Sequence, residues 1–133
     1  MPFFRLALFG LLAIVWMPTA LAADLPASEQ QRVAFLIESV ARLQGAVFIR
    51  NGTEHPAADA AEHLTMKLRR AKNSWFAPPA ESWTAELFID KLASRSSISG
   101  KPYQIRFADG SLVNAGDWLR QQLARYDAGA SSD

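Results

Sequence analysis

Residues 1–22 form an apolar segment with the pattern of a secretory leader, and this limits the part of the chain that folds. The single charge of Arg5 precedes an apolar run, Leu6–Trp16, and the small-x-small sequence Ala20-Leu21-Ala22 resembles a signal peptidase site. The run is about 11 residues, well short of the roughly 20 that a membrane-spanning helix needs. We therefore expect a signal peptide, a single folded domain at residues 23–133, and a periplasmic or secreted location.

The composition of the chain narrows the function of that domain. The chain has 14 basic and 13 acidic residues, so loss of Arg5 with the leader leaves equal numbers. Dedicated binders of nucleic acid or of anionic membranes need a basic surplus, and the balance argues against both. The chain has no cysteine, which excludes disulfides, thiol catalysis and a lipid-modified cysteine. We expect no nucleic-acid partner and no stable membrane anchor after leader cleavage.

Four segments have the apolar spacing of helices. Ser28 and Gln31 fit a capping box for the first helix, which is followed by Gly45 at a left-handed position. Cations near the end of the second helix, including Lys67, are expected to be solvated. The predicted helices are residues 29–44, residues 56–72, one that Thr84 caps, and one that starts at Asn114.

The segment between the second and third predicted helices, residues 73–82, is expected to be a loop. It contains Trp75 and Phe76 followed by two prolines. We expect the aromatic side chains to tie this loop to the domain.

Strand signals are weaker and concentrate near the C-terminus. Residues 103–107 alternate apolar and polar side chains, and Asp109-Gly110 turns the chain into residues 111–113, which predicts a β-hairpin. A two-stranded hairpin is marginal alone, so it must pack on helices. Residues 46–50, before the turn at Asn51-Gly52, provide a third short strand. The predicted fold is α+β: a small helix-rich domain of about four helices with a C-terminal antiparallel β-hairpin.

Two tracts, residues 48–55 and 94–103, carry more polar groups than folding requires. We predict that they meet across one cleft, in which arginine and lysine hold an anionic group and asparagine and serine orient it. A helix end, with Gly100 in a left-handed turn, is the alternative explanation of the second tract. The candidate ligand-binding residues are Arg50, Asn51, Glu54, His55, His63, Ser97, Lys101 and Tyr103.

The two histidines also invite a metal or catalytic interpretation. Eight residues of helix span about 12 Å, so both imidazoles reach one ion only if His55 lies off the helix. A hydrogen bond from His63 to Asp59 is the simpler interpretation. Ser97 with either histidine as base defines a hydrolase alternative, although the chain has no Gly-x-Ser-x-Gly sequence. We predict no metal, no cofactor and no catalytic residue.

Several motifs occur in one order along residues 33–125. They are F-I-R-N-G-T-E-H (48–55), A-x-x-H-L-x-x-K-L (60–68), T-A-E-x-F-I-D-K (84–91) and A-S-x-S-S-I-S-G-K-P-Y (93–103). In these motifs the chain resembles the YfeK-like proteins, a family of small exported bacterial proteins with an uncharacterised domain. The resemblance implies an envelope location and a stand-alone domain, and it implies no activity.

The expected function is that of a non-catalytic periplasmic domain that binds a small polar ligand or an envelope protein. A hydrolase that acts on cell-envelope material is one alternative. A structural assembly partner is the other, and an exposed apolar patch near Trp75 and Phe76 would favour it.

Overall fold

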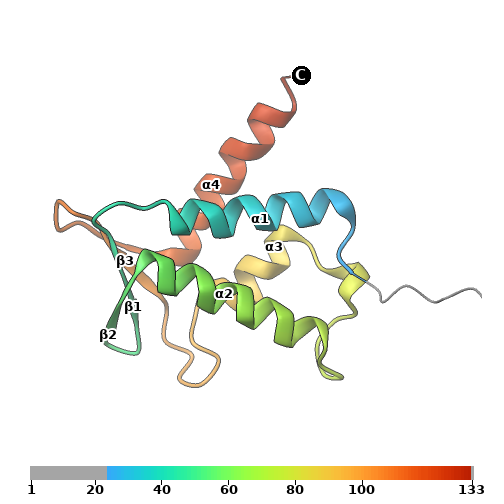
Figure 1. Ribbon diagram of the computed structural model, residues 1–133, viewed down its shortest axis with the longest axis horizontal. Coiled ribbons are helices and arrows are strands. Elements are labelled where there is room, and N and C mark those ends of the chain that lie inside the picture. Colours follow the sequence, from blue (N-terminus) through green and yellow to red (C-terminus); the bar gives the residue numbers. More distant parts are fainter. Residues whose placement is uncertain (1–23, 133) are drawn as a thin grey trace, which may run out of the picture.

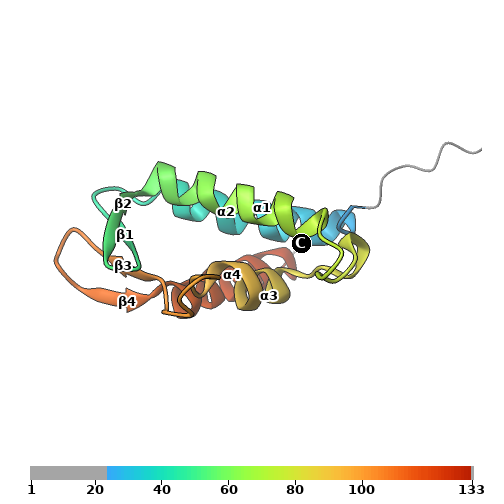
Figure 2. The same cartoon turned by 90° about the horizontal axis from the view of Figure 1, so that it is seen from below.

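The computed structural model describes residues 24–132, and the predicted signal peptide lies outside the described residues. The domain is α+β, as the sequence predicts, with two layers of helices closed at one end by a sheet (Figures 1 and 2). One layer holds α1 (Ala27–Ala41) and α2 (Ala57–Lys72). The other holds α4 (Ala115–Ala130) and α3 (Ala85–Phe88), which continues as the π-helix η2 (Ile89–Ala93).

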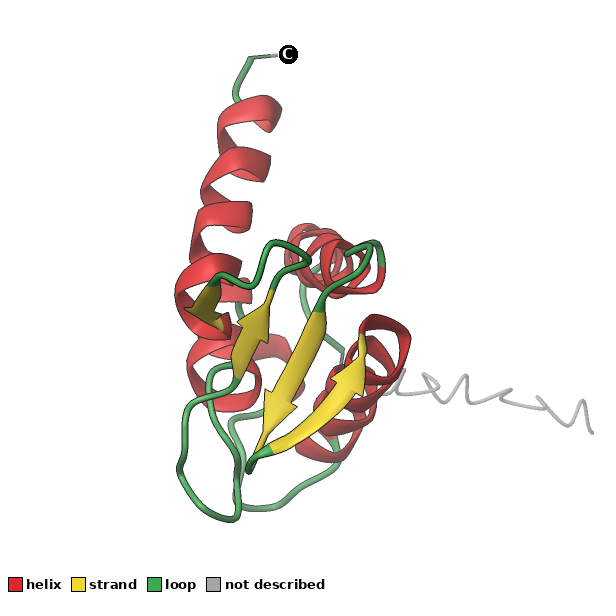
Figure 3. Cartoon of the chain, turned by 90° about the vertical axis from the view of Figure 1, so that its left-hand side faces the viewer, coloured by secondary structure: helices red, strands yellow, loops and turns green. Residues whose placement is uncertain are grey.

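The sheet has four antiparallel strands in the order β2-β1-β3-β4 (Figure 3). The strands are β1 (Val47–Arg50), β2 (Thr53–Pro56), β3 (Gln104–Arg106) and β4 (Leu112–Asn114). The predicted C-terminal hairpin and third strand are present, but the prediction omitted β2. Asn51 and Gly52, with φ of 52° and 77°, form the turn that starts it. Glu and Pro have little β propensity, so the residues of β2 do not predict a strand by themselves. They form one because they pair with the backbone of β1.

The ends of the helices show which capping predictions hold. Thr84 caps α3, since its Oγ1 accepts a hydrogen bond from the Leu87 N–H at 3.1 Å. The predicted capping box of α1 is wrong: Pro26 is the N-cap and Ser28 lies inside the helix. The Gln30 side chain instead donates to the Leu25 carbonyl at 2.7 Å and holds the chain where it enters α1.

The hydrophobic core lies between the two helical layers and extends under the sheet. It is one cluster, to which α1 contributes Leu36 and Val40 and the sheet contributes Phe48 and Ile105. Trp83, next to α3, is the largest of its fully buried side chains. In the loop of residues 73–79, Ala77 packs against the core, but Trp75 and Phe76 are exposed, so the predicted anchoring by these two side chains is wrong. None of the helices within residues 24–132 has the length and apolar character needed to cross a bilayer.

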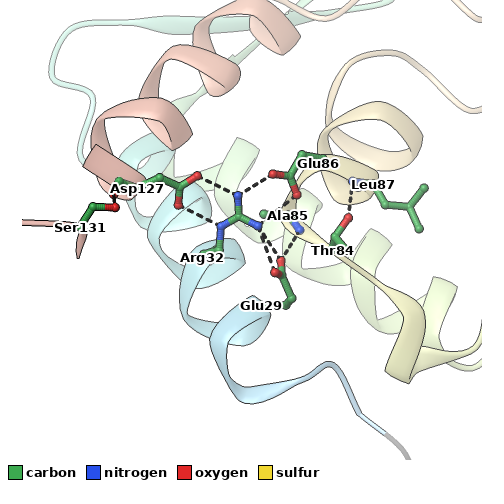
Figure 4. A network of polar contacts seen from close by, with 8 residues as sticks. All are labelled: Glu29, Arg32, Thr84, Ala85, Glu86, Leu87, Asp127 and Ser131. Atoms are coloured by element: carbon green, nitrogen blue, oxygen red, sulfur yellow. Dashed lines mark hydrogen bonds and ion pairs between the residues drawn. The ribbon is translucent and has the colours of Figure 1, made fainter. Parts of the chain in front are cut away.

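A polar cluster around Arg32 joins α1 to α3 and α4 (Figure 4). The guanidinium donates to Asp127 at 2.8 and 3.0 Å, to Glu86, and to Glu29 at 3.0 Å. Glu86 and Asp127 raise the pKa of Arg32, which stays charged. Glu29 also accepts a hydrogen bond from the Ala85 N–H at 2.7 Å, at the start of α3. One side chain thus fixes the relative positions of three helices.

Gly116 marks a close approach between α4 and the end of η2. A Cβ at this position would lie 2.5 Å from the Ser94 Oγ and 3.1 Å from the Ser94 Cβ. We expect Gly116→Ala to lower the free energy of unfolding by about 1 to 3 kcal/mol, as overpacking does. Gly129, in the same helix, has open space around it, so Gly129→Ala should be neutral or slightly stabilising. Urea unfolding compares the two variants; equal effects would contradict the close contact.

Candidate functional site

A pocket of about 230 Å³ lies where the inner face of the sheet meets α2 and the start of α4. Most of its lining is apolar and comes from α1, α2, α4 and the buried ring of Phe48. Five polar side chains also line it: Arg50, His55, Asp59, His63 and Tyr103. An apolar cavity with a few polar groups is the usual form of a small-molecule site.

Strand pairing explains why Arg50 and His55 face this pocket. Phe48 pairs with His55 on β2 and with Ile105 on β3, so these three side chains share the inner face of the sheet. Arg50 lies two residues after Phe48 and points to the same face. The predicted turn at Asn51-Gly52 therefore delivers a guanidinium and an imidazole to one side of the hairpin.

The other polar groups of the pocket come from α2 and from the residue before β3. Asp59 and His63 are one helical turn apart on α2. Tyr103 is fixed by its backbone: its N–H donates to the Ser94 carbonyl at 2.9 Å, and its carbonyl accepts from the Ala115 N–H at 2.8 Å. The Tyr103 ring packs edge-on against His63, with 6.4 Å between ring centroids.

Lys67 is a buried cation, so the prediction that it lies at a solvated helix end is wrong. Only 9% of its surface is exposed. Its ammonium donates to the Tyr103 hydroxyl at 3.0 Å and to the Arg95 carbonyl at 3.3 Å, and lies 5.1 Å from the centre of the Tyr103 ring. The sequence signal that was missed is the spacing of Lys67 from Leu64. Residues three apart share a helix face, so Lys67 lies on the same buried face of α2 as Leu64.

Burial and positive charge change the titration of the groups in and behind the pocket. Burial, helped by the charges of Arg50 and Lys67, lowers the pKa of His63 to about 4. Burial and Arg50 lower the pKa of Lys67 to about 8. Burial raises the pKa of Tyr103, against the effect of Arg50. At neutral pH, His63 is uncharged, Lys67 is mostly protonated and the Tyr103 hydroxyl keeps its hydrogen.

The low pKa of His63 makes the stability of the fold sensitive to acid. In the unfolded chain His63 binds a proton near pH 6.5 and in the fold only near pH 4, so between these values the unfolded state binds more protons. Stability should therefore fall as the pH drops from 6.5 to 4. Because His63 is partly exposed and solvent screens its interactions, we expect the wild type to lose about 1 to 2 kcal/mol more than His63→Gln between pH 7 and pH 4. Urea unfolding at both pH values measures this, and parallel losses would contradict it.

The structure brings four of the eight candidate residues to the pocket: Arg50, His55, His63 and Tyr103. Glu54 is on the outer face of the sheet, opposite Ile49, and forms an ion pair with Arg106. Alternation along β2 separates it from His55, its neighbour in sequence. Glu54 therefore does not line the pocket.

The two polar tracts do meet, at Asn51. Its amide donates to the Ser96 Oγ at 3.2 Å and accepts from the Ser99 hydroxyl. Ser96 is buried, and its Oγ also accepts from the N–H groups of Ile98 and Ser99 at 3.2 and 3.3 Å. Asn51 and Ser96 thus tie the β1–β2 turn to the serine loop, residues 96–101.

The remaining two candidates, Ser97 and Lys101, lie outside the pocket. Ser97 lines a separate open hollow beside α3, together with Asp90 and Arg95. Lys101 is exposed. The predicted single cleft is therefore reduced to a pocket on one side of the Asn51–Ser96 contact. The second cation near Arg50 is Lys67 instead of the predicted Lys101.

The metal and hydrolase alternatives can be compared with this geometry. His55 is on β2 and so lies off the helix, yet no three His, Asp or Glu side chains within residues 24–132 are grouped to hold a metal ion. His63 and Asp59 both line the pocket. Among the residues that the structure describes, no hydrogen bond joins a serine hydroxyl to either histidine, and Ser97 lines a different hollow.

Comparison with known proteins identifies the family. Residues 27–127 match a family of unknown function, DUF5329. The uncharacterised protein YfeK of Salmonella typhimurium is 40% identical over 81 residues, which are 61% of this chain and 62% of that protein. The chain thus spans less than two thirds of the length of this relative. No solved structure matches the chain. The predicted resemblance to YfeK-like proteins is confirmed, and the chain belongs to the DUF5329 family.

Proposed function

We propose that this protein is an exported, non-catalytic binding domain that takes a small amphipathic anion into the pocket. The apolar lining would receive the body of the ligand, and the Arg50 guanidinium would bind its anionic group. The hydroxyl of Tyr103 and the imidazoles of His55 and His63 offer further hydrogen-bonding groups.

The charge around Arg50 is the observation that carries this proposal. None of the ion pairs within residues 24–132 involves Arg50. Asp59 is the single carboxylate among the residues that line the pocket. The positive charge of Arg50 lowers the pKa values of His63 and Lys67, so its field reaches both groups. A partly buried guanidinium without a counter-ion favours an anion from solution.

The size of the pocket limits the ligand. At about 230 Å³ it has the volume of roughly eight water molecules, and it is smaller than the roughly 300 to 1,000 Å³ typical of sites for drug-sized molecules. The preferred ligand is therefore a monocarboxylate with a short apolar body, of the size of benzoate or hexanoate.

The exported location is part of the same proposal. It rests on the leader pattern of residues 1–22 and on the family resemblance. Expression of the full chain in a bacterial host, followed by mass measurement of the exported product, tests it. A product that begins at Ala23 supports the proposal, and a full-length product that stays in the cytoplasm contradicts it.

Calorimetric titration with benzoate and hexanoate tests the binding function. We expect Arg50→Gln to weaken binding by roughly tenfold to a hundredfold, as loss of a charged hydrogen bond does. Arg106→Gln is the matched control, because Arg106 is on the outer face of the same sheet, paired with Glu54; it should bind like the wild type. Benzyl alcohol, which lacks the charge, should bind more weakly than benzoate.

The outcome that contradicts the proposal is equally definite. The proposal is overturned if neither benzoate nor hexanoate binds to the folded wild type at millimolar concentration. Equal affinity of the wild type and Arg50→Gln would show that the anion is held elsewhere.

A further inference from the structure

Trp75 and Phe76, here called the aromatic tip, are adjacent residues in the loop between α2 and the short 3-10 helix η1 (Ala80–Ser82). Their exposed fractions are 98% and 101%, so these side chains bury almost nothing against the described domain. Single exposed apolar residues are common on protein surfaces, but two neighbouring aromatic side chains in full contact with water indicate a surface that another phase or molecule covers.

The aromatic tip lies at the end of the molecule opposite the pocket. His63 lines the pocket and Lys72 ends α2, so about 13 Å of helix separates them at 1.5 Å per residue. The Lys72 ammonium forms an ion pair with Asp24 at 3.0 Å. The described chain therefore begins beside the end of α2, from which the loop of the aromatic tip continues (Figures 1 and 2). In the sequence the apolar run Leu6–Trp16 precedes this point.

The last turn of α2, which precedes the loop of the aromatic tip, carries cations. Arg69 and Arg70, in the last turn of α2, are exposed, and neither takes part in an ion pair within residues 24–132. The domain has balanced charge overall, but that balance says nothing about where the charges lie. Trp and Phe favour the interface between water and lipid, and guanidinium groups bind the phosphates of lipid headgroups.

We propose that the aromatic tip docks reversibly on an anionic phospholipid bilayer, with Trp75 and Phe76 at the level of the headgroups and Arg69 and Arg70 on lipid phosphates. This contact is peripheral and differs from a stable anchor. It places the end where the chain enters the fold against the membrane and leaves the pocket facing solvent. The proposal does not depend on the ligand of the pocket.

The test uses the exported product of the full chain and vesicles of phosphatidylglycerol and phosphatidylethanolamine, with and without brominated acyl chains. Brominated lipid should quench part of the tryptophan emission of the wild type. Trp75→Phe keeps an aromatic side chain and removes this fluorophore, so it should still sediment with the vesicles and lose that part of the quenching. The double variant Trp75→Ser, Phe76→Ser should partition into the vesicles roughly tenfold less or worse.

Further variants test the contribution of the two arginines and the position of the exposed apolar side chains. Arg69→Gln with Arg70→Gln should weaken binding to the anionic vesicles several-fold, and binding to phosphatidylcholine vesicles should be weaker than to anionic ones. Ile98, which is 96% exposed in the serine loop, provides the matched control, and Ile98→Ser should bind like the wild type. All variants should melt like the wild type, because none of the four side chains at this end is buried.

Two results would overturn the proposal. One is equal binding to anionic vesicles by the wild type and the Trp75→Ser, Phe76→Ser variant. The other is a wild type that ignores vesicles and dimerises in solution, with the dimer lost in that variant, since the occupant of the aromatic tip would then be a second copy of the chain.

Discussion

Replacement of Trp83 by alanine is expected to lower the free energy of unfolding by about 3 to 5 kcal/mol. Trp83 is 1% exposed and belongs to the core cluster. Its removal leaves a cavity between the helical layers, and the Pro78 carbonyl loses the hydrogen bond that the indole N–H donates at 2.9 Å. A domain of this size has a total stability of only about 5 to 15 kcal/mol, so a large fraction of the stability would disappear. Urea unfolding measures the loss.

Trp75 provides the matched control for this prediction, because its side chain is 98% exposed. Trp75→Ala should change the free energy of unfolding by no more than about 0.5 kcal/mol. Similar losses for the two tryptophans would show that the Trp75 side chain packs on the domain, contrary to its exposure in the structure. Trp83→Phe, which keeps most of the apolar volume and loses the hydrogen bond, should lie between the wild type and Trp83→Ala.

Arg32→Met is expected to destabilise the domain by about 2 to 3 kcal/mol, more than loss of a surface ion pair and less than loss of a buried one. The guanidinium, whose side chain is 17% exposed, binds three carboxylates. Without it, Glu29, Glu86 and Asp127 repel one another where three helices meet. The hydrogen bond from Arg32 lowers the pKa of Glu86, so the loss should shrink in acid as this carboxylate becomes protonated.

Arg42, the C-cap residue of α1, is the control for Arg32. Its side chain is 73% exposed and pairs only with Glu38, one turn earlier. Arg42→Met should leave the urea midpoint unchanged. If Arg42→Met and Arg32→Met had the same effect, the cluster in Figure 4 would not contribute more than an ordinary surface pair.

The candidate site was predicted in part because some of its geometry is local. Arg50 and His55 flank an Asn-Gly turn, and such a turn brings the strands on either side together. Ser97 and Lys101 were predicted to join them, but the fold of residues 95–102 is set by contacts that have no signature in the sequence. The Arg95–Pro102 bridge and the Asn51–Ser96 hydrogen bond turn this loop away from the pocket.

Lys67 shows the limit of the same reasoning. A lysine near a helix end is normally solvated, and the rule failed because Tyr103 and the Arg95 carbonyl, both far away in the sequence, supply partners that permit burial. The role of Arg32 was missed for the same reason, since Glu86 and Asp127 come from α3 and α4.

The sequence by itself determined the features that depend on neighbouring residues: most helical segments, the Thr84 cap, the C-terminal hairpin and the family. Apolar spacing, capping side chains and turn residues act within a few positions, so they can be identified without the fold. The tertiary structure alone decided the pairing of β2, the burial of Lys67, the cluster at Arg32 and the exposure of the aromatic tip. Each of these depends on whether residues distant in the chain supply a partner or leave a side chain in water, and the free energy of burial is set by that environment.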